Sequence, residues 1–235
     1  MHLPKVPFIT KKTKFLLKWK TLIYLVSLKE GRGLFYCYVL KSPKLFFRFL
    51  FSIISSKKVS IKENNYFFYG YSHFDEIKSS YREKNTILIL GFSYCQKPLN
   101  CPAGRFNDQC HRDLSHFSCK DCIIGEVKNK PEFFRLKIII IPTFLYLAEF
   151  LCKEQNKMPK KNFIFLITAC ELSFKMFERY ASLLKLKGIG IRLQGRICNT
   201  FDAFKLAERG IKPGLTFITS SIKNDIRRLL NILES

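Results

Sequence analysis

The fold is decided by a stretch in the C-terminal half of the chain, residues 163–180, which reads FIFLITACELSFKMFERY. Its first part, 163–168, is an almost unbroken apolar run, typical of a strand buried on both faces of a sheet. From Glu171 the apolar residues recur at helical spacing, which predicts a helix over 171–186. A strand that leads directly into an amphipathic helix is half of a β-α-β unit, so the stretch favours an α/β fold with parallel strands.

The same alternation of strand and helix extends to both sides of this stretch. Strands are predicted at 86–92, 136–141, 163–168 and 189–193, with helices at 171–186, at 200–209 and from Thr143 onward. Asn199 is the expected N-cap of the helix 200–209, and Gly188-Ile-Gly190 is interpreted as a turn at the entry to the strand 189–193. A short strand (215–219) and a helix (222–233) complete the pattern. The prediction is an α/β three-layer sandwich with a mainly parallel sheet and a cysteine-rich insertion.

Residues 1–64 differ from the rest and are predicted to be a basic helical extension of a cysteine-rich α/β domain at 85–235. They hold 14 Lys and Arg but two acids, a net charge of +12 out of +23 for the chain. Apolar residues here recur at helical spacing among lysines, which fits a helix on an anionic membrane surface or a helix packed on the domain. Nucleic acid is a less favoured partner. Lys, Phe, Ile and Asn share A/T-rich codons, which explains part of the charge without any partner.

The chain shows no pattern of a secreted or membrane-spanning protein. No stretch reaches the ~20 continuous apolar residues that a spanning helix needs, and the longest candidate, 138–151, contains Pro142 and Glu149. Nine cysteines, an odd number without the spacing of a disulfide scaffold, favour a reducing cytoplasm with metal-bound or unmodified thiols. Cys37 and Cys152 lie in apolar surroundings and are expected to be buried thiols that pack as small hydrophobes.

The other seven cysteines carry the strongest signal of a site. Five lie in the polar loop 95–122, where no apolar core is available to bury them, and two follow later strands. The loop includes a Cys-x-x-Cys pair, a spacing that suits both zinc and iron–sulfur ligation. His111 and His116 lie in the same loop and either share in coordination or are solvated. The candidate metal ligands are Cys95, Cys101, Cys110, Cys119, Cys122, Cys170 and Cys198.

Three of these cysteines follow directly on predicted strands. Ligands of parallel α/β sheets bind beyond the carboxyl ends of the strands, so Cys95, Cys170 and Cys198 are expected to meet there. The loop cysteines are expected to join them in one site. Cys170 and Cys198 each precede a helix, whose dipole favours a thiolate; the alternative is a small residue at a tight turn. Candidate cofactor-binding residues nearby are Arg105, Arg196, Asn199 and Thr200, and the alternative for both arginines is a solvated surface position.

Ordered together, these pieces resemble a known family. Cys95, Cys101-Pro, Cys119-x-x-Cys122-Ile-Ile-Gly125, Ala169-Cys170-Glu171 and Gly195-x-x-Cys198-Asn199-Thr200-x-Asp202 are similar to the domain-of-unknown-function family numbered 116, over residues 85–205. The resemblance implies a cysteine-rich α/β domain with iron–sulfur binding and picks out six of the seven cysteines. The family carries a further cysteine about where His116 stands, so either Cys110 substitutes for it or the metal differs.

Two functions follow from the sequence. The first is an iron–sulfur or other metal-binding protein in redox or cofactor-related metabolism, with cysteine thiolates as ligands. The second is a non-enzymatic module with structural zinc in the loop, which docks on a membrane or nucleic acid through its basic N-terminal segment. No G-x-G-x-x-G, Walker-type loop or H-E-x-x-H motif is present, so no substrate is indicated.

Overall fold

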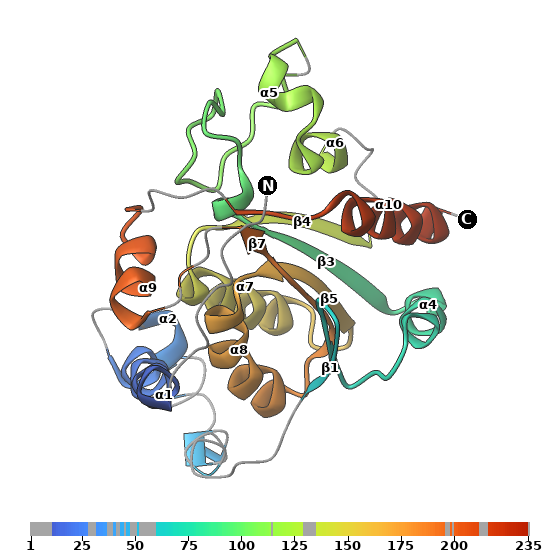
Figure 1. Cartoon of the computed structure of the whole chain (residues 1–235). Coiled ribbons are helices and arrows are strands. Elements are labelled where there is room, and N and C mark those ends of the chain that lie inside the picture. The colour runs from blue at the N-terminus through green and yellow to red at the C-terminus, as the bar shows by residue number, and fades with distance from the viewer. Residues whose placement is uncertain are drawn as a thin grey trace.

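The fold was analysed in a computed structural model. It describes residues 11–27, 32–36, 40, 43–44, 46–47, 51, 60–113, 115–128, 135–195, 198, 200–211 and 216–234. The chain forms an α/β structure around a six-stranded sheet (Figure 1). The strands of this sheet are β1 (Ser60–Glu63), β2 (Tyr66–Tyr69), β3 (Thr86–Ser93), β4 (Leu136–Ile141), β5 (Asn162–Ala169) and β6 (Lys187–Arg192).

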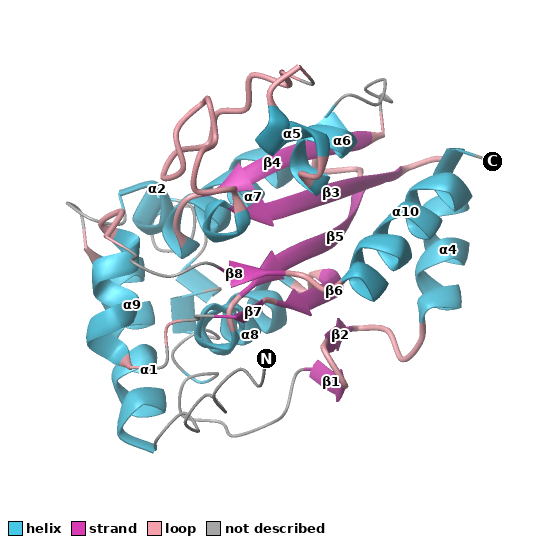
Figure 2. Ribbon diagram, turned by 45° about the horizontal axis from the view of Figure 1, so that its top comes forward, coloured by secondary structure: helices cyan, strands magenta, loops and turns pink. Residues whose placement is uncertain are grey.

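The predicted α/β class and mostly parallel sheet are confirmed. The strand order is β1-β2-β6-β5-β3-β4, and the four predicted strands β6, β5, β3 and β4 are parallel neighbours. All residues of β3 except the last are buried, because helices cover both faces of the sheet (Figure 2). This burial explains why the strand reads as a continuous apolar run.

Each face of the sheet has its own apolar core. On one face lie α1 (Lys11–Val26), α2 (Arg32–Phe35), α7 (Phe144–Lys157), α8 (Glu171–Leu184) and α9 (Phe201–Glu208). On the other lie α4 (Phe74–Arg82), α6 (Ile123–Lys128) and α10 (Ser220–Glu234). The strand connections run in opposite directions from β3, and right-handed crossovers then put the connecting helices on opposite faces. The short α5 (Phe117–Lys120) and the 3-10 turn η2 (Tyr94–Gln96) belong to the cysteine-rich loop.

The sheet begins earlier in the chain than expected. β1 and β2 form a hairpin whose turn contains Asn64 at φ 51, and β2 pairs antiparallel with β6. The expected boundary at residue 64 therefore falls inside this hairpin. An Asn-Asn turn between two short strands is a recognisable hairpin signal, but here it lies next to the basic segment and was grouped with it.

The short strand predicted within 215–219 is present as β8 (Thr216–Phe217), which pairs with β7 (Gln194–Gly195) in a separate two-stranded sheet. Two further predictions are corrected. The N-cap of α9 is Thr200, whose hydroxyl accepts a hydrogen bond from the Ala203 backbone N–H at 3.1 Å, and not Asn199. Gly188 and Gly190 lie within β6 and not in a turn; a Cβ on Gly190 would approach the Phe174 ring to 2.5 Å.

The basic helix α1 packs on the domain. Leu17 and Thr21 are buried, and α1 contacts α8 and α9. None of the helices in the described part of the chain is long and apolar enough to cross a membrane.

Candidate functional site

The cysteines that follow strands lie where the sheet reverses its winding. From β3 the chain passes to β4 on one side and then crosses back to β5 on the other, so β3 and β5 flank the switch point. Open α/β sheets bind ligands in the crevice beyond the carboxyl ends of such a strand pair. Cys95 follows the end of β3, and Cys170 directly follows β5. Thr168 joins the two strand ends, since its hydroxyl accepts a hydrogen bond from the Ser93 N–H at 3.0 Å.

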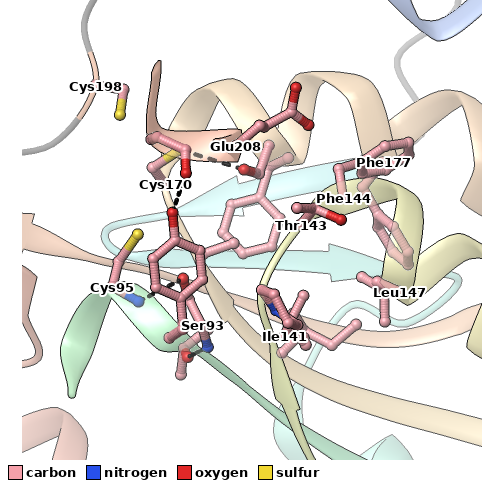
Figure 3. A pocket seen from close by; sticks show the side chains of 18 of the residues that line it. Ser93, Cys95, Ile141, Thr143, Phe144, Leu147, Cys170, Phe177, Cys198 and Glu208 are labelled. Carbon is pink, nitrogen blue, oxygen red and sulfur yellow. Dashed lines mark hydrogen bonds between the residues drawn. The ribbon is translucent and has the colours of Figure 1, made fainter. Parts of the chain in front are cut away.

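A small cavity of about 50 Å³ lies at this point. Its volume compares with that of one or two water molecules, each of which takes about 30 Å³ in the liquid. Figure 3 shows the thiols of Cys95, Cys170 and Cys198 on one side of it and the aromatic rings of α7 and α8 on the other. The lining thus combines three sulfur atoms with an apolar wall. All three cysteines line this cavity at the carboxyl edge of the sheet, as expected from their positions after strands.

Tyr94 and Glu208 complete the polar side of the cavity. The Tyr94 hydroxyl donates a hydrogen bond to the Ala207 carbonyl oxygen, which ties the end of β3 to α9. Burial, with the nearby Cys95, Cys198 and Glu208, raises the pKa of Tyr94 well above its ordinary value, so the phenol is neutral. The Glu208 carboxylate forms an ion pair with Lys20 of α1 at 3.0 Å. The Glu208–Lys20 ion pair therefore connects the cavity lining to the N-terminal helix α1.

Cys170 immediately precedes the first residue of α8. Its sulfur lies 3.3 Å from the Ser173 hydroxyl, in the first turn of the helix. Its side chain is 9% exposed and that of Cys198 is 7% exposed. Both thiols are accordingly shielded from bulk solvent, and neither belongs to a disulfide.

Three of the remaining loop cysteines, Cys101, Cys110 and Cys122, lie close enough to Lys97 for their charge to affect its pKa. This lysine is 2% exposed, and its ammonium donates hydrogen bonds to Asn107 Oδ1 at 2.8 Å and to the Gln109 carbonyl oxygen at 2.9 Å. Burial lowers the pKa of Lys97. The surrounding acidic groups, Cys101, Cys110, Cys122 and Asp108, act in the opposite direction.

These three thiols and that of Cys119 also interact with one another. Burial raises the pKa of the Cys119 thiol, and Cys101, Cys122 and Cys110 raise it further. Burial likewise raises the pKa of Cys122, although the backbone N–H groups of Gly125 and Ile124, at the start of α6, favour its thiolate. Like charges at close range oppose ionisation, so burial and the neighbouring thiols both favour the protonated form of Cys119 and Cys122.

The structure thus brings the seven cysteines together in two groups. Cys95, Cys170 and Cys198 line the cavity at the switch point; Cys101, Cys110 and Cys122 lie near Lys97, and Cys119 lies near these three. The groups adjoin, because Cys95 and Lys97 are two residues apart. In the described part of the chain, no three His, Cys, Asp or Glu side chains already stand together in a way that would hold a metal ion.

The other candidate residues serve the local structure. Arg105 is buried and not solvated: its guanidinium donates to the Cys95 carbonyl oxygen at 3.2 Å, and burial lowers its pKa. Thr200 caps α9. His116 accepts a hydrogen bond from the Ser118 N–H through Nδ1 at 3.3 Å and so caps α5, whereas His111 is exposed. Arg196 and Asn199 lie outside the described residues.

Cys152 corrects a further expectation. It is 5% exposed in the apolar core under α7, as its surroundings predict, but it is disulfide-bonded and not a thiol. Cys37, for which the same role was expected, lies outside the described residues.

No family model, curated protein or solved structure matches this chain. The resemblance to family 116 therefore stays a prediction. The candidate function depends on the two groups of cysteines, one at the cavity and one near Lys97.

Sequence reasoning missed the residues that organise these groups. Lys97, in Cys95-Gln-Lys97-Pro98, reads as one of many surface lysines, and its burial depends on the loop folding over it. Tyr94 and Glu208 come from distant parts of the chain. Only the position of Tyr94, directly after a buried strand, offered a signal.

Proposed function

We propose that this protein binds an iron–sulfur cluster or a metal ion through Cys101, Cys110, Cys119 and Cys122. The observation that carries the proposal is the mutual proximity of these four thiols, three of which also lie near the buried ammonium of Lys97. Four thiolates in one polar loop are the donor set of both iron–sulfur and structural zinc sites. The side chains would have to turn toward a common centre on binding.

The chemistry of the donor set fits a cationic group. Cysteine thiols become thiolates when a metal takes up their charge, so binding is coupled to proton release. Four thiolates exceed the charge of a divalent ion, and the loaded site is left negative. Lys97 lies where it balances that excess charge. The N–H groups of Ile124 and Gly125 beside Cys122 supply the hydrogen bonds that tune such sites.

The cavity thiols have a separate role in this proposal. Cys95, Cys170 and Cys198 face the position at which α/β sheets bind ligands. We assign them to redox or nucleophilic chemistry next to the loop site, in redox or cofactor-related metabolism. The alternative, a non-enzymatic module with structural zinc in the loop, makes the same use of the four loop cysteines and none of the cavity thiols.

The proposal also includes a three-layer sandwich with a cysteine-rich insertion and a cytoplasmic location. Apolar cores on both faces of the sheet support a three-layer sandwich, in which the loop 95–122 is a cysteine-rich insertion between β3 and β4. Seven thiols support a reducing, cytoplasmic location. The disulfide of Cys152 is compatible with this location because its sulfur is shielded from reductants in the core.

Anaerobic purification of the full chain, followed by visible absorption and by analysis of iron, zinc and acid-labile sulfide, tests the proposal. Brown colour with iron and sulfide supports the cluster; stoichiometric zinc without colour supports the alternative. Cys119→Ser and Cys122→Ser should lose most of the bound metal, whereas the matched variants Cys170→Ser and Cys198→Ser should retain it. Loss in the second pair but not in the first would refute the assignment of ligands.

A further inference from the structure

The outer face of α1 carries large apolar side chains in water. Phe15, Trp19 and Ile23 are 58%, 52% and 50% exposed, and they lie four residues apart, on one stripe of the helix. The opposite side of the helix is fixed to the domain through Leu17 and Thr21, which are 2% and 1% exposed. The helix thus already packs one face on the domain, and the exposed stripe is a second, separate apolar face.

Neighbouring N-terminal segments extend this apolar surface. Tyr36, Leu40, Phe47 and Phe51 are also largely exposed, at 54% to 73%. Figure 1 shows these N-terminal helical pieces gathered beside α8 and α9, on the side of the molecule away from α4 and α10. We call this surface, defined by Phe15, Trp19, Ile23, Tyr36, Leu40, Phe47 and Phe51, the N-terminal face. Exposed apolar side chains collected on one side of a molecule mark an interaction site.

The charge of the segment identifies the partner. α1 contains five lysines and no acid, and residues 1–64 hold 14 Lys and Arg against two acids. Aromatic and aliphatic residues flanked by lysines suit a bilayer of anionic lipid, in which the apolar side chains enter the interface and the lysines meet head groups.

We propose that the N-terminal face docks the protein peripherally on an anionic phospholipid bilayer. Nucleic acid, which also attracts basic proteins, fits less well. Single-stranded nucleic acid would stack on the five aromatic residues of the face, but it provides no apolar layer in which Ile23 and Leu40 are buried, whereas the bilayer interface does. The distribution of charge supports the same choice, since the +12 of residues 1–64 is concentrated on the segment that carries the exposed apolar residues.

Trp19 makes this proposal directly testable, since it is the only tryptophan of the chain. Its fluorescence should shift to the blue, and lose accessibility to acrylamide, when vesicles of phosphatidylcholine with 30% phosphatidylserine (roughly the anionic content of a cytoplasmic leaflet) are added to the full chain. Vesicles of phosphatidylcholine alone should produce little change, and high salt should reverse the shift because it screens the lysines.

Two variants give the control. Phe15→Ser with Ile23→Ser should weaken vesicle partition about tenfold or more, since two apolar side chains no longer enter the interface. Phe117→Ser, at an aromatic residue that is 66% exposed in the loop 95–122, should leave partition unchanged. An unshifted Trp19 spectrum with anionic vesicles overturns the proposal, as does equal binding to neutral vesicles. Binding to a single-stranded oligonucleotide without binding to vesicles would assign the face to nucleic acid instead.

Discussion

Replacement of Lys97 by methionine tests whether a buried cation organises the cysteine-rich loop. The Lys97 ammonium donates to two well-placed oxygens, Asn107 Oδ1 at 2.8 Å and the Gln109 carbonyl at 2.9 Å, and makes a longer contact of 3.4 Å with the Asn107 carbonyl. Methionine keeps much of the volume of the stem but leaves these acceptors without their donor. The variant thus removes the charge and the hydrogen bonds with little change in packing.

The expected loss of stability follows from opposing effects. Hydrogen bonds to a charged group contribute about 1.5 to 3 kcal/mol each, and two good ones are lost. Relief of the desolvation penalty of a buried ammonium, several kcal/mol in real proteins, offsets part of this loss. We expect the free energy of unfolding of the metal-free protein to fall by about 2 to 3 kcal/mol, mainly because each orphaned acceptor costs about 1 kcal/mol or more.

Urea unfolding under anaerobic, reducing conditions measures this loss. Lys120→Met is the matched control, since Lys120 is exposed in the same loop; its effect should stay within about 0.5 kcal/mol. If Lys97→Met is as stable as the unmodified protein, the loop does not depend on the buried cation. In the metal-loaded protein the same variant should also retain less metal than Lys120→Met, because the negative charge of the loaded site is no longer balanced.

Three further predictions concern the scaffold of the site. Burial alone would raise the pKa of Glu154, but hydrogen bonds from Lys137 and Lys157 lower it overall; Glu154→Gln should therefore reduce the free energy of unfolding by about 2 kcal/mol at neutral pH. A lowered carboxyl pKa contributes stability that is fully present above the unfolded pKa of about 4.3 and is lost as the pH falls through the lower folded-state pKa. The difference between the two proteins should therefore shrink steadily in urea titrations below about pH 4.3; a difference that stays constant down to the lowest pH at which the protein folds would contradict the ion-pair explanation. Gly190→Ala should cost about 1 to 3 kcal/mol in thermal unfolding, because the Phe174 ring, stacked on Phe67 at 5.0 Å, must move; Gly125→Ala, whose Cβ would meet nothing closer than 3.4 Å, is the control and should be near neutral. Thr200→Ala should cost about 1 kcal/mol through loss of the α9 cap, whereas Asn199→Ala should not, and the reverse ranking in urea titrations would restore Asn199 as the cap.

The central strands could be predicted because burial on both faces leaves a direct mark on the sequence. β4 begins and ends at the predicted residues, and β3 and β5 differ from the prediction by one residue at their ends. The hairpin β1–β2 left no such mark, since its strands have four residues each and three of the four in β1 are exposed. In the β2 strand, YFFY, the burial of Phe67 depends on its stacking on Phe174 of α8. That contact joins residues 107 positions apart and has no local signal.

The candidate site was predictable to a similar extent. The position of Cys95 and Cys170 after strands was enough to bring them to one edge, because parallel strands all end there. How the loop cysteines divide was not predictable. Cys95 is held beside the cavity by hydrogen bonds to its carbonyl oxygen from Thr216 at 2.6 Å and from Arg105 at 3.2 Å. The chain after Lys97 instead folds over the buried Lys97 ammonium. Both interactions depend on side chains whose burial is a tertiary property.

The ion pair between Lys20 and Glu208 connects the two proposals. Lys20 belongs to α1, whose outer face is proposed to meet lipid, and Glu208 lines the cavity that holds Cys95, Cys170 and Cys198. Both side chains are largely buried, at 16% and 11% exposure, so the pair is screened less by solvent than a surface pair. A bilayer that holds α1 in place therefore also fixes one wall of the thiol cavity. The N-terminal helix is consequently a structural part of the site as well as a candidate anchor, which is why its packed face and its exposed face are both needed.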